Sequence, residues 1–132
     1  MDSVKQYVPL LGRILIGQLF LLAGISKIGA FAGVAAGMAS KGIPASQLLL
    51  VITIIVEVGG GLMIILGWRA RLAATVLFLW MIPVTLMYHN FWAMTGQAAY
   101  INQIMFQKNL AIMGAMCLLF VFGSGRYSLS DK

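Results

Sequence analysis

The sequence contains very few of the side chains that hold redox centres or metal ions. Among its 132 residues it has one cysteine, Cys117, and one histidine, His89. A single cysteine cannot form an intrachain disulfide or a Cys-x-x-Cys redox pair, and a single histidine cannot ligate a haem from both sides. Because the chain has only three acidic residues, we also predict no metal site. These absences leave enzymatic activity open, but they favour a subunit over a stand-alone enzyme.

Charged residues are equally scarce, and long apolar stretches take their place. Only 9% of the chain is charged and 61% is hydrophobic, whereas soluble domains carry roughly 25% charged residues. A helix needs about 20 mainly apolar residues to cross a bilayer, and four stretches reach this length, at about 9–28, 45–67, 72–89 and 104–123. We therefore predict an all-α integral membrane protein: one domain, 1–132, with four transmembrane helices in a compact bundle.

The connector between the first two spans has a helical pattern of its own. Phe31, Val34 and Met38 are spaced as on one apolar face of a helix, and a helix of this kind lies in the membrane interface rather than across the bilayer. Gly42 and Pro44 then indicate a turn. The sequence thus predicts a short interfacial helix between transmembrane helices 1 and 2.

The net charge of +6 is distributed as single basic residues near the ends of the spans. Residues in such positions act as orientation signals, so the charge does not indicate nucleic-acid binding. With four spans both termini lie on one side, which carries Lys5, Arg13, Arg69, Arg71, Arg126 and Lys132. The other side carries Lys27, Lys41 and Lys108. This bias predicts a multi-pass protein of a bacterial inner membrane with both termini in the cytoplasm.

One acidic residue, Glu57, lies near the middle of the second span. A charge at the centre of a bilayer costs roughly 3 kcal/mol on insertion scales, so we expect basic partners from neighbouring helices. Arg13 and Lys27 share one face of the first span with Gly17 and Gly24, because their spacing follows the helical period. The first span therefore offers Glu57 one cation on each side.

Residues near the far ends of the third and fourth spans complete a candidate ligand-binding cluster. In a compact bundle its members would face the interior: Glu57, Arg13, Lys27, His89, Lys108 and Asn109. Ionisable groups inside a membrane are functional by default, but these groups also suit a purely structural role that fixes helix register. Beside them, Gly59–Gly61 either admits a neighbouring helix closely or leaves room for a ligand.

Several short motifs follow one another along the chain. The first two are Arg13-x-x-x-Gly17-x-x-Phe20-x-x-x-Gly24-x-x-Lys27 and Met38-Ala39-x-x-Gly42-x-Pro44. The later ones are Glu57-x-Gly59-Gly60 with Leu66-Gly67, His89-x-Phe91-Trp92, Phe106-x-Lys108-Asn109-Leu110, and Gly123-x-Gly125-x-x-Ser128-Leu129-Ser130. Their order and spacing resemble those of the DoxX family over nearly the whole chain. The mild departure is Ser130, where that family commonly has Asp.

The resemblance implies four membrane helices and a redox-stress context, and it names no reaction. The family name comes from a quinol oxidase or thiosulfate:quinone oxidoreductase complex. Other members are linked to a membrane oxidoreductase complex with superoxide dismutase and a sulfurtransferase, or to responses against quinones and electrophiles. The resemblance therefore implies a lipid-embedded protein with a membrane or soluble oxidoreductase partner and quinone as its candidate ligand.

Three functions stay open. The first is a redox-associated membrane subunit that binds a quinone-like ligand through Glu57, His89 and Lys108, with the glycine-thinned second span making room for the ring. The second is a membrane scaffold or assembly factor without a small ligand, and the third is a small proton-coupled exporter that uses Glu57. No covalent cofactor is expected. A homo-oligomer also stays open, because glycine stripes serve helices within one chain or between two.

Overall fold

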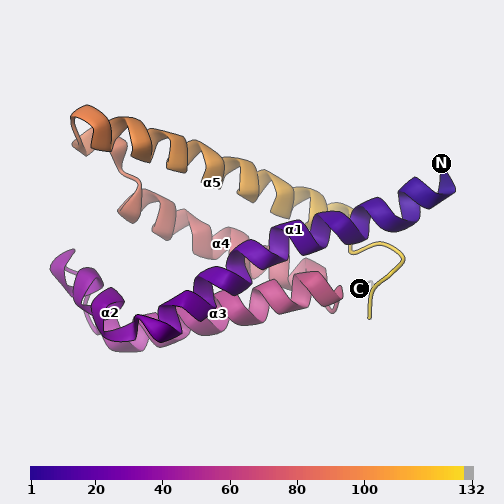
Figure 1. Cartoon of the computed structure of the whole chain (residues 1–132), viewed down its shortest axis with the longest axis horizontal. Helices are drawn as coiled ribbons and strands as arrows, with labels where there is room; N and C mark the ends of the chain where they lie inside the picture. The colour runs from indigo at the N-terminus through magenta and orange to yellow at the C-terminus, as the bar shows by residue number, and fades with distance from the viewer. Residues whose placement is uncertain (130–132) are drawn as a thin grey trace.

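The protein is an all-helical bundle built from two antiparallel helix pairs. The computed structural model describes residues 1–129, so the motif position Ser130 and the orientation signal Lys132 lie outside the described residues. The elements are α1 (Asp2–Gly29), α2 (Phe31–Ser40), α3 (Ser46–Leu66), α4 (Ala70–Tyr88), the 3-10 helix η1 (Phe91–Ala93) and α5 (Gly96–Phe122). Figure 1 shows α1 beside α3 and α4 beside α5, with both termini at the same end. Contacts between α3 and α4 join the two pairs.

Four of these helices are long and apolar enough to cross a membrane, and α2 is the predicted short helix between the first two. The predicted all-α fold is therefore confirmed. Two helices extend beyond the predicted spans, since α1 starts at Asp2 rather than near residue 9 and α5 starts at Gly96 rather than near residue 104. Both extensions contain polar residues, which a search for apolar length leaves out.

Glycines bring α1 and α3 into close contact. A Cβ added to Gly17 would lie 2.7 Å from the carbonyl oxygen of Gly61, and a Cβ added to Gly61 would lie 2.7 Å from the carbonyl oxygen of Gly17. A Cβ on Gly24 would lie 2.6 Å from the side chain of Val58. The glycine face of α1 is thus a packing surface, as small residues commonly are between membrane helices.

The opposite side of the α3 glycine run faces α4. A Cβ added to Gly60 would lie 3.0 Å from Leu77, which is fully buried in the main apolar core together with Ile64. Only Gly59 of the three glycines has open space around it. The hypothesis that these glycines make room for a ligand ring is therefore wrong at Gly60 and Gly61, because neighbouring helices fill both positions.

Candidate functional site

The acidic residue in the middle of α3 has a basic partner on α1. Lys27 Nζ lies 2.7 Å from Glu57 Oε1, and the two side chains are 28% and 12% exposed. Gly24, one turn before Lys27, allows α1 to approach the Cβ of Glu57, so the glycine packing also brings the charges together. A charge-assisted hydrogen bond of this kind is stronger than a neutral one. It offsets part of the cost of placing Glu57 inside a membrane.

An apolar pocket of about 410 Å³ lies beside this ion pair. It is found between α3 and α4, at the end where Figure 1 shows these helices diverging and α2 folding back. Aliphatic side chains such as Met38, Leu50 and Val84 make most of its wall. The polar or aromatic members of the wall are Lys27, Thr53, Glu57, Trp80, Tyr88 and His89. A mainly apolar cavity with a few convergent polar groups is typical of a small-molecule site.

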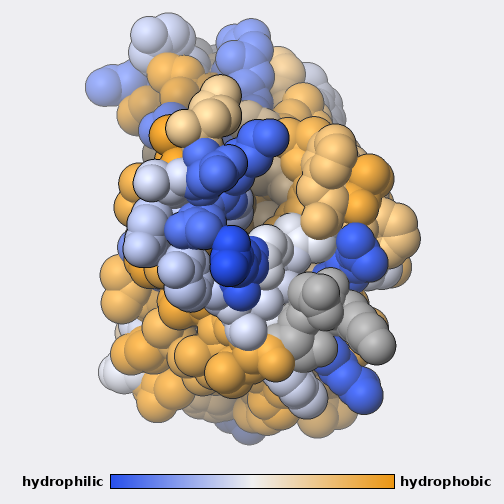
Figure 2. Space-filling view, turned by 90° about the vertical axis from the view of Figure 1, so that its right-hand side faces the viewer, coloured by the Kyte–Doolittle hydropathy of each residue, from blue (hydrophilic) through white to orange (hydrophobic). Residues whose placement is uncertain are grey.

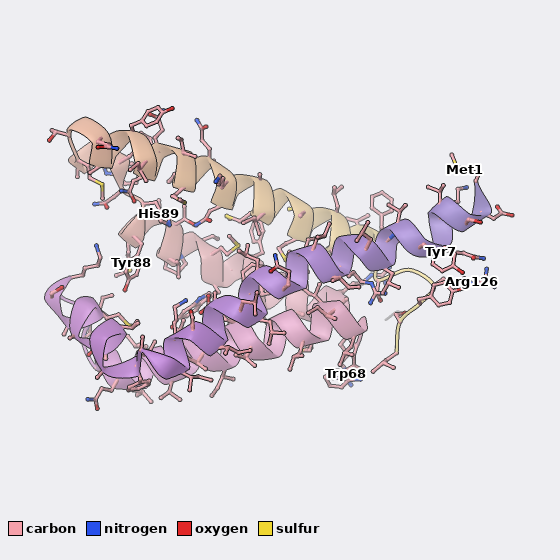
Figure 3. All side chains as sticks on the ribbon, in the orientation of Figure 1. Met1, Tyr7, Trp68, Tyr88, His89 and Arg126 are labelled. Carbon is pink, nitrogen blue, oxygen red and sulfur yellow. The ribbon has the colours of Figure 1, made fainter. Side chains whose placement is uncertain are left out.

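The short helix α2 closes one side of the pocket. Its buried residues Ala35 and Met38 pack against Leu50 of α3. Lys41, which follows α2, places its Nζ 5.0 Å from the centre of the Tyr88 ring, a distance suited to a cation–π contact. Figure 3 shows Tyr88 at the end of α4 that faces α2. The connector therefore covers the pocket by contacts with both α3 and α4.

Polar contacts with α5 hold the end of α4 in place. His89 Nδ1 lies 3.0 Å from Asn102 Oδ1, and Asn102 Nδ2 donates to the carbonyl oxygen of Ala98 at 2.9 Å. Further along α5, Asn109 Nδ2 donates to Thr85 Oγ1 at 3.0 Å. Of these residues only His89 lines the pocket, so Asn109 joins two helices and does not belong to the wall.

Arg13 has a different role from the one that the sequence predicted. Its side chain is 2% exposed and donates to the carbonyl oxygens of Ile64, Ile65 and Tyr127. The last carbonyls of a helix lack intrahelical partners and carry partial negative charge. Arg13 therefore caps the C-terminal end of α3 and ties the C-terminal segment to it. It forms no ion pair with Glu57, which corrects the prediction of a cation on each side.

Lys108 lies on the outer surface, at the middle of α5, and has no ion-pair partner within residues 1–129. The neighbouring Phe106 packs edge-on against Phe91 and Trp92, with ring centres 5.5 and 5.8 Å apart, and this contact fixes how α5 is rotated. The pocket thus brings together Lys27, Glu57 and His89 of the six predicted residues. It does not include Arg13, Lys108 or Asn109.

Known proteins match this chain over nearly its full length. The model of the DoxX family matches residues 8–90, which is more than half of the chain. The chain belongs to the DoxX family. Inner membrane protein YphA of Escherichia coli K12 is 35% identical over 130 residues, covering 98% of this chain and 93% of the relative. Inner membrane protein YqjF of the same organism is 37% identical over 129 residues, covering 98% and 94%. No solved structure matches.

Three polar or aromatic residues of the pocket wall in this DoxX-family inner membrane protein, and one residue that holds His89, were missing from the predicted cluster. Thr53 lies one helical turn before Glu57 on the same face of α3, so helical spacing offered a signal for it. Trp80 and Tyr88 are aromatic residues of an apolar helix, and no local pattern marks them as parts of a pocket wall. Asn102, which holds His89, precedes the predicted fourth span, in a stretch whose polar residues predict a loop rather than a helix.

Proposed function

We propose that the protein binds a small quinone-like molecule, a quinone or its hydroquinone, in the pocket between α3 and α4. The observation that carries this proposal is the Lys27–Glu57 ion pair in the wall of a mainly apolar pocket of about 410 Å³. A short-tailed quinone is flat and apolar except for its two ring oxygens. Pockets of this size and composition suit such ligands.

The residues present fit both parts of the ligand. Met38, Leu50 and Val84 offer apolar surface to the ring. The Lys27 ammonium has three N–H groups, of which one is used by Glu57, so the others are available to a ring oxygen. Hydrogen bonds from a charged donor are roughly twice as strong as neutral ones, and this favours an oxygen of the ligand at the ion pair.

The proposed role is that of a redox-associated membrane subunit. With one cysteine and one histidine, the chain has no thiol pair or bis-histidine haem site of its own. We therefore place the oxidoreductase chemistry in a partner, either in the membrane or at its surface, and assign this chain the binding of the ligand. The same pocket suits a response against quinones and electrophiles, in which uptake of the molecule is the function.

The test is ligand-dependent thermal stabilisation of the purified protein in detergent. A ligand that binds only the folded state stabilises it by about 2.7 kcal/mol at 100 times its Kd. We expect tetramethyl-1,4-benzoquinone, or its hydroquinone in the absence of oxygen, to raise the Tm of the unmodified protein. We expect either form to raise the Tm of Lys27→Met much less, because Lys27 is the proposed donor to a ring oxygen. The control is Gln18→Leu, because Gln18 is exposed on α1 and bonds only within its own helix. No shift with either form in the unmodified protein, or an equal shift in Lys27→Met, contradicts the proposal.

A second candidate is a membrane scaffold or assembly factor. The observation in its favour is that Lys27 and Glu57 balance one another's charge without a ligand. In that case Glu57→Gln lowers the yield of folded protein, and no quinone changes the Tm of the unmodified protein. The exporter loses support, because a carboxylate that exchanges protons for a cationic drug has to be accessible, and Glu57 is bound to a lysine.

We also propose that both termini face the cytoplasm. Figure 2 looks onto the end of the molecule where the termini lie and shows hydrophilic residues gathered there, with apolar residues around them. Lys5, Arg69 and Arg126 are exposed basic residues of this end, whereas Lys41 is exposed near the other end. Basic residues concentrate on the cytoplasmic side of membrane proteins, which supports this orientation.

A further inference from the structure

Two polar side chains of α3 present hydrogen-bond acceptors to the pocket. Thr53 Oγ1 donates its proton to the carbonyl oxygen of Leu49 at 2.8 Å, so only its lone pairs are left for a ligand. An ionised Glu57 has no donor, and its second carboxylate oxygen has no hydrogen-bond partner among residues 1–129. This side of the wall therefore accepts protons in hydrogen bonds and does not donate them.

His89 adds a third acceptor, because its neighbour determines which ring nitrogen carries the proton. Asn102 Nδ2 donates to the carbonyl oxygen of Ala98, which leaves the acceptor Oδ1 facing His89 at 3.0 Å. The hydrogen-bond network thus assigns the proton to His89 Nδ1. A neutral imidazole carries one proton, so Nε2 keeps a lone pair, and it has no partner in the part of the chain that the structure describes.

The wall also contains hydrogen-bond donors, namely the remaining N–H groups of Lys27 and the indole N–H of Trp80. The Tyr88 hydroxyl can either donate or accept a hydrogen bond. A hydroxyl group both donates and accepts hydrogen bonds. We infer that the pocket selects a hydroxyl-bearing ligand, the hydroquinone rather than the quinone. This inference rests on the proposed function and adds to it the oxidation state of the bound molecule.

The selection follows from what each form leaves unpaired. Both ring oxygens of a quinone are acceptors only, so a bound quinone accepts from Lys27 but offers no proton to His89 Nε2 or Thr53 Oγ1. A hydroquinone donates to these atoms and still accepts from Lys27. Since an acceptor that loses water without gaining a donor weakens binding by roughly tenfold or more, the hydroquinone binds at least about tenfold more tightly.

The experiment compares tetramethylhydroquinone with tetramethyl-1,4-benzoquinone in the absence of oxygen. Their Kd values for the full-length protein in detergent are measured by titration calorimetry at pH 8. A second pair, 2,3,5,6-tetramethylphenol and its methyl ether, differs in the O–H donor without a change of oxidation state. We expect the hydroquinone and the phenol each to bind about tenfold more tightly than the partner that lacks the donor.

Two variants show whether His89 is the group responsible. Asn102→Leu removes the acceptor that fixes the His89 proton, from a position outside the pocket wall. We expect it to raise quinone affinity and lower hydroquinone affinity, whereas a loss of structure would weaken both. His89→Phe abolishes most of the preference, and a preference that persists in both variants contradicts the role of His89.

The outcomes for the unmodified protein separate the two proposals. A tenfold preference for the hydroquinone supports the inference. Equal binding of the two oxidation states, or tighter binding of the quinone, overturns the inference and leaves the proposed function standing. Binding of neither ligand overturns both.

Discussion

Lys27 and Glu57 depend on one another because both side chains are largely removed from water. Removing one partner of a buried ion pair leaves an uncompensated charge, which costs about 3 kcal/mol or more. We expect Lys27→Met to lower the free energy of unfolding by about 3 kcal/mol, measured by SDS titration of tryptophan fluorescence in mixed micelles. Glu57→Met costs less, because the flexible lysine stem carries its ammonium group towards the polar layer.

The combined variant separates charge from packing. Lys27→Met together with Glu57→Met removes both charges and keeps side chains of similar length, and replacing a buried ion pair by apolar residues is often neutral. The double variant therefore recovers most of the stability that Lys27→Met loses. If it is as unstable as Lys27→Met alone, the loss comes from packing at these positions, and the ion pair is not what holds α1 against α3.

At this scale the sequence predicts the inward orientation of Arg13, Lys27 and Glu57, but it is wrong for Lys108, which lies on the outer surface. It also does not show which groups the inward side chains meet. Glu57 was predictable because it is the one acid within a span, and Lys27 because it follows the glycine face of α1. Arg13 lies on the same face of α1 as Lys27 but binds a different partner. Its hydrogen-bond acceptors are backbone carbonyls at the end of α3, and no side-chain pattern in the sequence marks those carbonyls.

At the scale of the helices, the close contact of α1 with α3 depends on the absence of side chains at Gly17 and Gly61. A Cβ on Gly17 would lie 2.5 Å from the Ile65 side chain and 2.7 Å from the carbonyl oxygen of Gly61. The backbone oxygen cannot move without shifting α3, and overpacking of this kind costs about 1–3 kcal/mol. We expect Gly17→Ala to lower the free energy of unfolding by that amount in the same SDS titration.

A matched control lies on the same helix. A Cβ on Gly12 meets no atom within 4 Å, so Gly12→Ala is sterically free and gains up to about 1 kcal/mol from the higher helix propensity of alanine. Because both variants replace glycine by alanine in α1, the difference between their free energies of unfolding reports the effect of position alone. Equal destabilisation by Gly12→Ala and Gly17→Ala would show that close approach of α1 and α3 is not what Gly17 provides.

Some helix ends can be predicted from the sequence, and others cannot. The end of α3 at Gly67 was predictable, because glycine readily adopts the positive φ of 68° found there. The hydrogen bonds Gly67 N–H to Ile64 and Trp68 N–H to Met63 complete a Schellman motif. The start of α5 was not predictable from apolar length, since residues 96–103 are helical yet polar enough to be read as a loop.

The pocket itself belongs to the whole molecule. Its wall takes residues from α1, α2, α3 and α4, and it exists because the two helix pairs meet at one end and diverge at the other (Figure 1). The lengths of the apolar stretches predict the four long helices, and this part of the predicted fold was correct. The angle between pairs follows from side-chain packing among Leu77, Ile64 and their neighbours, which no single span encodes.

The two ends of the molecule also differ in charge, and this makes orientation testable. When Arg13, which caps α3, and Lys27, which is paired, are left out, exposed basic residues are still more numerous at the end that holds both termini. For labelling, Cys117→Ser first removes the single native thiol. Ser3→Cys then places a thiol near the start of α1, and Thr95→Cys places one before α5, at the opposite end.

We expect a membrane-impermeant maleimide to label the Thr95→Cys protein in cells whose inner membrane is intact. The Ser3→Cys protein reacts only after that membrane is opened, because the basic end stays in the cytoplasm. Gel-shift of the labelled protein gives the measurement, and the Cys117→Ser background without a second change gives the blank. The reverse pattern contradicts the proposed orientation. Labelling of both positions in intact cells contradicts it too, because it requires chains inserted in both directions.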